Sequence, residues 1–340
     1  MEDEVQVMDN VEAIIDGIAS AGAVKGRGII EGLDGKTRDD LFSLLRSRSD
    51  ALFGKKVKAY IPGKKFPAIS VTGSSCDLQC EHCNKRYLRN MVPALNPESL
   101  EKTLKALHSS GGTGALISGG STKDGVVEMG KYYDTLRKIK NGTGLKLNMH
   151  TGLIDRDIAR QLFYTGADTI SLDLVGDDRI IKEIYHLDKT TSDYIETLKG
   201  FIDAGFTREQ IAPHICIGLY KGEITGEYRV LDYLSMLDPR LIVFIILIPP
   251  REGDSTIDFN HVPVRDVGNL VAVARILYPE AEISIGCMRP GGNKRKEYDL
   301  EAFRAGITRI ALPTKALEKY LEKNGYVVER MNNCCAIEVF

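Results

Sequence analysis

The feature of this sequence that most constrains its fold is an alternation, repeated from Ala68 onward, of short apolar segments with amphipathic segments of helical length. Short apolar runs are typical of buried strands, and apolar residues spaced three or four apart are typical of helices that cover a sheet. The apolar segments predict eight strands, at residues 68–71, 114–118, 145–149, 168–174, 211–219, 241–248, 282–286 and 307–312. The amphipathic segments predict helices at residues 96–108, 128–140, 155–164, 191–204, 227–237, 264–277 and 314–323.

Eight units of strand and helix close most naturally into a (β/α)8 barrel of TIM type, whose catalytic residues follow the carboxyl ends of the strands. We therefore expect an α/β protein with a barrel at residues 64–313, a helical N-terminal extension at 1–63, and a C-terminal helix and tail at 314–340. An open doubly wound sheet is the alternative, because hydrophobic periodicity does not reveal whether a sheet closes.

Composition narrows the class of protein and its partners. Hydrophobic residues make up 43% and charged residues 27% of the 340 residues, which suits a buried core and excludes a disordered or collagen-like chain. The formal net charge of -2 gives no general attraction for nucleic acid or anionic membrane. The longest apolar run, residues 241–250, is about half of what spans a bilayer, and the chain starts with acidic residues. We expect a cytoplasmic protein with no nucleic-acid or membrane partner.

Three of the seven cysteines lie together in a loop after the first predicted strand: Cys76, Cys80 and Cys83. In a cytosolic chain such spacing favours metal or redox chemistry over disulfides. An iron–sulfur cluster normally has four cysteine ligands, so three would leave one iron open to a substrate or cofactor. A closed zinc site, with His82 or a remote cysteine as the fourth ligand, is an alternative, and so is chance spacing.

With this CxxxCxxC loop directly after the first strand, the sequence resembles the radical S-adenosylmethionine (SAM) superfamily. The resemblance implies a 4Fe–4S cluster on Cys76, Cys80 and Cys83, with the fourth iron chelated by the amino and carboxylate groups of SAM. Reductive cleavage of SAM would give a 5′-deoxyadenosyl radical that abstracts hydrogen from an unactivated carbon. His82 replaces the usual aromatic residue before the third cysteine and is a mild departure from the family pattern.

From about residue 70 to 312 the chain is similar to biotin synthase and its relatives, in the order of its elements and in short motifs such as Arg86-Tyr87, Gly166-Ala167-Asp168, Gly218-Leu219, 272–277 and 305–307. The similarity implies a SAM site with three parts. Gly119, Gly120 and Ser121 would bind the amino group, Asp173 the ribose or amino group, and Lys189 the carboxylate. From the residues alone, the same positions would be a loop turn, a buried salt bridge and a surface lysine.

Four further cysteines lie outside the loop. Cys216 falls inside a predicted strand, where packing is the simpler interpretation. Cys287 follows the seventh predicted strand, at a position that resembles the arginine ligand of the second cluster of biotin synthase. Together with Cys334 and Cys335 it is a candidate for an auxiliary iron–sulfur centre, against persulfide or redox chemistry or no role. The second-cluster cysteines of biotin synthase are replaced by Ile117 and Asn148, so we do not expect biotin synthase itself.

Among these relatives the chain looks most like the archaeal-type two-protein lipoyl synthases. The resemblance implies sulfur insertion into an octanoyl chain on a carrier protein, an electron donor such as ferredoxin, and a second radical SAM protein as partner. Rearrangement or cofactor-assembly chemistry on a small-molecule substrate is the alternative, and a non-catalytic zinc or iron–sulfur protein is the contrasting class. His150 is expected to be a satisfied loop histidine, and the basic run 292–296 a solvated loop rather than a contact for an acidic carrier.

Overall fold

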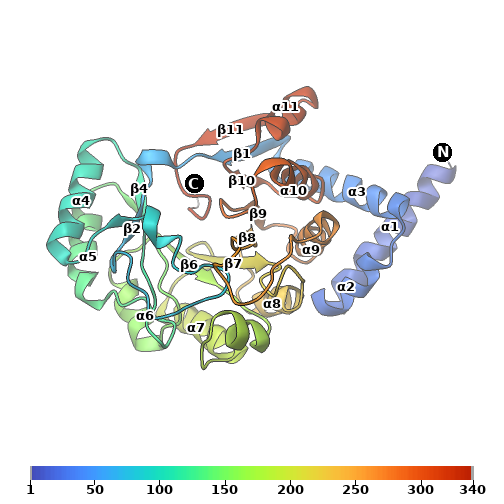
Figure 1. The fold of residues 1–340 in the computed structure, drawn as a ribbon. Helices are drawn as coiled ribbons and strands as arrows, with labels where there is room; N and C mark the ends of the chain where they lie inside the picture. Colours follow the sequence, from blue (N-terminus) through green and yellow to red (C-terminus); the bar gives the residue numbers. More distant parts are fainter. Residues whose placement is uncertain (1, 338–340) are drawn as a thin grey trace.

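The computed structural model describes residues 2–337, with side chains from Gln6 onward, and is built around a single all-parallel sheet of eleven strands (Figure 1). The order of the strands across the sheet is β11-β1-β10-β9-β8-β7-β6-β5-β4-β2-β3. Their bounds are β1 Lys56–Tyr60, β2 Ala68–Ser70, β3 Val92–Pro93, β4 Gly114–Ser118, β5 Lys146–Met149, β6 Thr169–Asp173, β7 Ile211–Ile217, β8 Leu241–Ile246, β9 Glu282–Ile285, β10 Arg309–Ala311 and β11 Val327–Met331. The sheet curls into an open barrel of TIM type, with β3 and β11 as its edges.

Helices cover the outer face of the sheet and also form an arm at the N-terminus (Figure 1). Their bounds are α1 Glu2–Ala21, α2 Ala23–Glu31, α3 Gly35–Phe53, α4 Pro97–Ser109, α5 Tyr133–Gly142, α6 Arg156–Phe163, α7 Thr191–Ala204, α8 Glu227–Tyr233, α9 Val264–Leu277, α10 Gly292–Arg304 and α11 Lys315–Lys323. A short π-helical segment, Ile180–Ile184, lies between β6 and α7. Within the described part of the chain, none of the helices has both the length and the apolar character needed to cross a bilayer.

The eight predicted strands are confirmed as β2 and β4 to β10, and three further strands join them. β8 is an apolar run of six residues with one partly exposed member, as expected for a strand covered on both faces of a parallel sheet. β1 and β11 have weaker signals because lysines, glutamate and arginine interrupt them, and they pair with each other at one edge. They lie in the segments 1–63 and 314–340 and belong to the same sheet as the barrel strands.

The basic run expected to be a solvated loop, residues 292–296, is the first turn of α10. This prediction was wrong because the helix begins without the usual sequence signals. Its N-cap and first turn have two glycines (291 and 292) and three cations (294–296), and no side chain caps its N-terminus. The helix is instead held by its buried face, where Tyr298, Asp299, Ala302 and Phe303 pack inward. Tertiary packing therefore overrides an unfavourable N-terminal turn.

The N-terminal arm is tied to the barrel helices by buried polar contacts. Arg38 of α3 donates to the side chain of Asn269 (2.7 Å) on α9 and also forms an ion pair with Glu301 of α10. Arg46, two turns further along α3, donates to the carbonyl oxygen of Ile307 (2.7 Å). These contacts fix α3 against the outer helices, while α1 projects away from the barrel (Figure 1).

The described chain after β11 turns into the interior of the barrel (Figure 1). Cys335 and Ala336 are buried in a small apolar cluster that the barrel wall completes with residues Tyr60, Ala212, Leu241, Val243 and Ala311. The buried Arg309 guanidinium donates to the carbonyl oxygen of Ile337 (2.9 Å), and Thr113 Oγ1 donates to that of Asn332 (3.1 Å). The tail therefore fills part of the interior and contacts Arg309 of β10 and Thr113, which precedes β4, on opposite sides of the opening.

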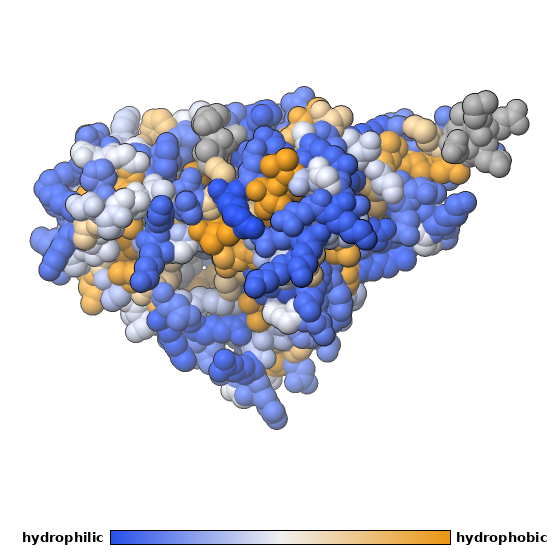
Figure 2. Space-filling model, turned by 90° about the horizontal axis from the view of Figure 1, so that it is seen from above, coloured by the Kyte–Doolittle hydropathy of each residue, from blue (hydrophilic) through white to orange (hydrophobic). Residues whose placement is uncertain are grey.

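Seen from the side on which β11 and α11 lie, the surface is mostly hydrophilic (Figure 2). Hydrophobic residues are visible near the centre of this view, beside a hollow in the molecule. The hollow is consistent with a sheet whose two edges are not joined by a backbone ladder.

Candidate functional site

The cysteine loop follows β2 and is shaped by hydrogen bonds from its own polar residues. Ser70 Oγ donates to the carbonyl oxygen of Gly73 (2.7 Å), and Thr72 Oγ1 donates to that of Ser75 (2.9 Å). Thr72 Oγ1 also accepts a hydrogen bond from the backbone N–H of Gly120 (2.7 Å). The loop that carries Cys76, Cys80 and Cys83 is thus fixed to the segment after β4.

Gly120 allows this close approach because it has no side chain. A Cβ atom at Gly120 would lie 1.9 Å from the carbonyl oxygen of Ser75 and 2.5 Å from Cβ of Cys76, which no real side chain can occupy. Next to it, the backbone N–H of Ser121 points at Cys76 Sγ (3.3 Å), and Asp77 N donates to Ser121 O (2.8 Å). The structure therefore brings two of the sequence-predicted groups together, the glycine segment and the first cysteine.

The three loop thiols interact with one another. A hydrogen bond from the Cys80 thiol, assisted by a backbone N–H of Lys85 and the charge of Arg86, lowers the pKa of Cys83 to about 7. The same bond to Cys83, together with burial and the nearby Cys76, raises the pKa of Cys80. Thiolates are the ligands that iron–sulfur clusters require, so this group of thiols suits a cluster.

The loop also has a buried polar atom without a partner. His82 Nδ1 is buried and has no hydrogen-bond partner among the described residues, while its ring packs against Tyr185 with 5.3 Å between the ring centroids. Burial lowers the pKa of His82 to about 4, so the ring is neutral at pH 7. Across the described chain no three His, Cys, Asp or Glu side chains are placed to hold a single metal ion. In a 4Fe–4S cluster each cysteine binds a different iron, so the ligands need not meet at one metal ion. The three thiols, the close approach at Gly120 and the unpartnered Nδ1 atom of His82 fit such a cluster.

Asp173 ends β6 and pairs with a histidine that directly follows the neighbouring strand, β5. Its Oδ2 atom lies 3.0 Å from His150 Nε2, and the two side chains are 43% and 33% exposed. Burial opposes ionisation of Asp173, but the charge and hydrogen bond of His150, with His214 and His82 nearby, lower its pKa to about 2. Burial also disfavours a charged His150, yet Asp173 raises its pKa above the ordinary value. Asp173 is therefore a permanent negative charge that remains partly open to a ligand.

Lys189 is less exposed than a surface lysine would be. Its side chain is 29% exposed, and its Nζ atom lies 3.6 Å from Oδ1 of Asp124, a residue of the loop after β4. This contact places Lys189 over the segment that follows Gly120 and Ser121.

Sequence reasoning missed a carboxylate inside the cysteine loop. Glu81, between Cys80 and His82, is 8% exposed and accepts hydrogen bonds from His186, Ser255 and Thr256. Burial opposes its ionisation, but these hydrogen bonds lower its pKa to about 2. A glutamate at a variable position of a motif carries no signal in the sequence, because its partners lie more than 100 residues away.

The remaining predicted site residues come together inside the barrel. Cys287, after β9, is open to solvent, and Cys334 and Cys335 lie on the inserted tail. Although Cys287 is exposed, the surrounding protein atoms remove part of the water around its thiol, and this desolvation together with the neighbouring Cys334 raises the pKa of Cys287. A hydrogen bond from Cys335 lowers the pKa of Cys334 to about 7. Asn148, where biotin synthase-like proteins would carry a cysteine, directs its Nδ2 atom at Cys334 Sγ (3.8 Å). Cys216 packs partly buried against the main core.

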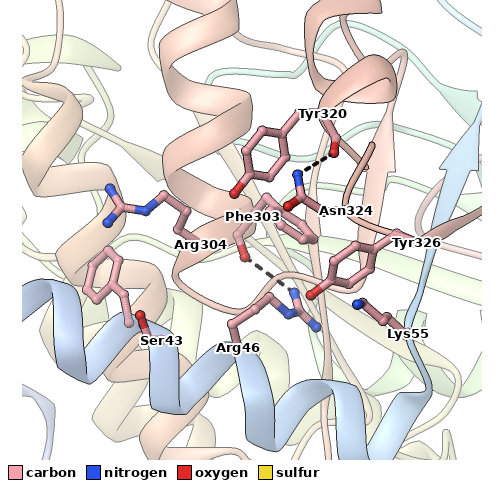
Figure 3. Close-up of a pocket in the computed structure, with 9 residues that line it drawn as sticks. Ser43, Arg46, Lys55, Phe303, Arg304, Tyr320, Asn324 and Tyr326 are labelled. Carbon is pink, nitrogen blue, oxygen red and sulfur yellow. Dashed lines mark hydrogen bonds between the residues drawn. The ribbon is translucent and has the colours of Figure 1, made fainter. Parts of the chain in front are cut away.

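A pocket lies elsewhere, outside the barrel, between α3, α10, α11 and the residue that precedes β11 (Figure 3). It has a volume of about 240 Å³ and is lined by aromatic and cationic side chains, among them Arg46, Phe303, Tyr320 and Tyr326. Two of its three cations form ion pairs, Arg46 with Asp50 (3.0 Å) and Arg304 with Asp39 (2.6 Å). The third, Lys55, lies over the ring of Tyr326, with 5.1 Å from its Nζ atom to the ring centroid. None of the predicted site residues lines it, so the interior of the barrel, with its cysteines, is the candidate site.

Comparison with known proteins agrees with this geometry. Residues 70–224 match the Radical SAM superfamily. Over 201 residues the chain is 26% identical to biotin synthase from Acaryochloris marina (strain MBIC 11017), a region that covers 58% of this chain and 53% of that protein. The chain thus spans about half the length of this curated relative.

Two solved structures share the fold. The FeFe-hydrogenase maturase HydG from Carboxydothermus hydrogenoformans has a TM-score of 0.68 at 15% identity, with 94% of this chain and 79% of that chain covered. Methylornithine synthase (PylB) has a TM-score of 0.63 at 16% identity, with 93% and 97% covered. At these identities the likeness concerns the fold alone.

Proposed function

We propose that this chain, a radical SAM enzyme similar to biotin synthase, inserts sulfur at an unactivated carbon of an acyl chain. Membership of the superfamily implies a 4Fe–4S cluster and SAM as cofactors. When bound, the two together supply a 5′-deoxyadenosyl radical for hydrogen abstraction. Cys76, Cys80 and Cys83 would hold the cluster, with Gly119, Gly120, Ser121, Asp173 and Lys189 around SAM.

The observation that carries this proposal is the close packing of the cysteine loop against the backbone of Gly120. Only glycine at position 120 permits the close contact with Ser75 and Cys76, and the backbone N–H of Ser121 donates a hydrogen bond to the sulfur of Cys76. Asp173 stays ionised and partly open, so it can accept hydrogen bonds from ribose hydroxyls or an ammonium group. Lys189 can attract a carboxylate as a point charge.

Sulfur insertion is supported by the second group of cysteines. Cys287, Cys334 and Cys335 lie near one another inside the barrel, although they are distant in sequence. An auxiliary iron–sulfur centre on these thiols would supply the sulfur. The proposed substrate is an octanoyl chain on a carrier protein, with a small-molecule acyl compound as the alternative.

The proposed partners follow from the chemistry. Reductive cleavage needs an electron donor such as ferredoxin, and the two-protein lipoyl synthases suggest a second radical SAM protein that shares the reaction. We place the enzyme in the cytoplasm, where reduced thiols are maintained.

Anaerobic reconstitution with iron and sulfide tests the proposal. The protein should turn brown and release 5′-deoxyadenosine when SAM and a reductant are added. An iron content of about eight per chain supports an auxiliary cluster, and about four contradicts it and favours rearrangement or cofactor-assembly chemistry. A colourless protein that binds zinc and no SAM would leave only the non-catalytic alternative.

The substrate is tested by anaerobic mass spectrometry with octanoylated carrier peptides. The expected result is a mass gain that corresponds to added sulfur. A protein that cleaves SAM but leaves every such peptide unchanged would contradict the lipoyl synthase-type activity.

A further inference from the structure

We propose that Glu81 is a positioning residue that holds the cysteine loop in register with the segment that carries Lys189, and so sets where SAM binds relative to the cluster. The inference rests on the proposed function and adds a residue to which neither the sequence nor the family comparison assigns a role.

On one side, Glu81 is bound to the turn between β6 and α7. Its backbone N–H donates to the carbonyl oxygen of Ile184 (2.9 Å), and its Oε1 atom lies 3.0 Å from His186 Nε2. Cys80 Sγ lies 3.8 Å from the carbonyl oxygen of Tyr185, between these two contacts. The cysteine loop is therefore joined to this turn through both its backbone and its side chains.

On the other side, Glu81 is bound to the long loop after β8. Its Oε2 atom accepts hydrogen bonds from Ser255 Oγ (2.6 Å) and from the backbone N–H of Thr256 (2.7 Å), and Oε1 accepts one from Thr256 Oγ1 (2.6 Å). A further contact, from Asn84 Nδ2 to the carbonyl oxygen of Asp254 (3.4 Å), joins the same two loops. One carboxylate thus connects segments that follow three different strands.

The free-energy cost of burying the Glu81 carboxylate indicates that its hydrogen bonds between the three segments have a role. The Glu81 side chain is 8% exposed, and among the described residues its ion-pair partner is His186, with no Lys or Arg in reach. A nearly buried carboxylate is expensive unless hydrogen bonds satisfy it, and here every accepting position is used by donors from the neighbouring segments. A simple packing role would be served more cheaply by an apolar side chain.

The turn that Glu81 holds is strained and leads directly to Lys189. His186 has a φ of 54°, a left-handed conformation that is uncommon for a residue other than glycine. Lys189 follows three residues later and contacts Asp124 across the glycine segment. If the bond from His186 to Glu81 is lost, the turn can relax and shift the ammonium group of Lys189.

The test uses the full-length chain, reconstituted anaerobically, with Glu81→Gln, Glu81→Ala and the control Glu252→Gln. Glu252 is an exposed carboxylate of the same β8–α9 loop, and no hydrogen bond or ion pair of the described residues involves it. SAM affinity is measured from the change that SAM causes in the electron paramagnetic resonance spectrum of the reduced cluster. Iron and sulfide are measured on the same samples.

We expect Glu81→Ala to keep the iron content of the wild type while its affinity for SAM falls by about tenfold or more, as is common for residues that orient a ligand's partners. The KM for SAM should rise more than kcat falls, Glu81→Gln should recover part of the affinity, and Glu252→Gln should match the wild type. A Glu81→Ala protein with a full cluster and unchanged SAM affinity would overturn the proposal. Loss of the cluster in both Glu81 variants would do the same, because it would assign Glu81 to cluster retention instead.

Hydrogen–deuterium exchange of the cofactor-free chain separates this inference from the proposed function. Residues 184–189 and 254–257 should exchange faster in Glu81→Gln than in the wild type, and equal exchange contradicts the positioning role. A wild type that binds neither iron nor SAM would contradict the proposed function, while the exchange result would still decide whether Glu81 joins the three segments.

Discussion

The two groups of cysteines in this molecule are built in opposite ways. Cys76, Cys80 and Cys83 lie within eight residues of one loop, and backbone hydrogen bonds and one glycine hold that loop in place. Cys287 and the pair Cys334-Cys335 are separated by more than 40 residues and meet because the tail packs inside the barrel. A site built from local chain geometry can be found by residue spacing, whereas a site built by packing cannot.

The two groups also differ in how they are anchored. The loop is anchored by polar contacts that leave its thiols half-buried or buried at the end of a strand. The tail is anchored by apolar burial and by a buried arginine that binds its carbonyl oxygens. We therefore expect the first group to respond to changes in its backbone fit, and the second to changes in core stability.

The largest expected effect separates the groups by function. Replacement of Cys76, Cys80 or Cys83 with Ala should reduce SAM cleavage to background, because in the proposed site each thiolate would hold one iron of the cluster. Cys287→Ala should still cleave SAM, but without coupling this cleavage to product formation, so that no sulfur is added to the substrate. The measurements are 5′-deoxyadenosine release and product mass, and intact cleavage in any loop variant would break the comparison.

The next effect tests the backbone fit of the loop. Gly120→Ala puts a Cβ where Ser75 and Cys76 already lie, so the loop must shift, at a cost of about 1–3 kcal/mol in unfolding free energy. Cluster content and SAM cleavage should both fall severalfold. Gly130→Ala, where no atom lies within 4 Å of the new Cβ, is the matched control. Equal cluster content in both variants would show that the close packing against Gly120 does not matter.

The next effect, on stability and not on SAM cleavage, is expected at the turn that presents Cys287. Arg289 and Asp299 form an ion pair (2.7 Å) in which both side chains are fully buried, and Arg289 also donates to the carbonyl oxygen of Gly286 (2.6 Å). Asp299→Asn leaves a buried charge without its partner and should lower the unfolding free energy by about 3 kcal/mol. Cys287 should also react faster with a thiol reagent.

The control for this variant is Glu297→Gln on the same helix. Glu297 pairs with Lys294 at the surface (3.1 Å), so its replacement should cost less than about 0.5 kcal/mol. If the two variants unfold at the same denaturant concentration, the buried pair does not stabilise the Cys287 turn.

The smallest effect concerns the pair that lies in the interior with both groups, His150 and Asp173. Asp173 raises the pKa of His150, so the contribution of the pair is full below the unfolded histidine pKa of about 6.5 and is lost as the pH rises through the folded pKa of His150. At the acid end it is lost as the pH falls from the unfolded aspartate pKa of about 3.9 through the folded pKa of Asp173, about 2. Because both side chains are about a third exposed or more, the gain should stay below about 1 kcal/mol. In Asp173→Asn, the His150 pKa measured by NMR should fall below its ordinary value, since burial then dominates. An unchanged titration would mean that Asp173 does not act on His150.

Much of the fold follows from local patterns, and the parts that do not have identifiable causes. The strand Leu241–Ile246 is nearly all apolar and has no competing interpretation. In the strand Lys56–Tyr60 two lysines alternate with apolar residues, so its apolar signal is weak. It is recognised as a strand only because it pairs with β10 and β11. The helix Gly292–Arg304 begins with residues that disfavour a helix, and burial of Tyr298 and Phe303 stabilises it.

The same division applies to the site. Loop spacing predicts the three cysteines as a group, and the contact between Ser121 and Cys76 lies where the resemblance implied the SAM segment. Glu81 could not be found in this way, because its donors come from loops far along the chain. The pairing of His150 with Asp173 was also missed, since it depends on which residues of adjacent strands face the interior.

The unjoined edges of the sheet give the barrel a mechanical property that a closed ring lacks. Between β3 and β11 no backbone ladder spans the seam in the described chain, and the six residues 332–337 reach across part of it instead. An open barrel can widen or narrow at the gap between its edge strands while the hydrogen bonds between its paired strands stay intact. The contacts across this opening include hydrogen bonds from the side chains of Thr113 and Arg309 to the tail, so the width of the interior depends in part on side chains and not on the sheet alone.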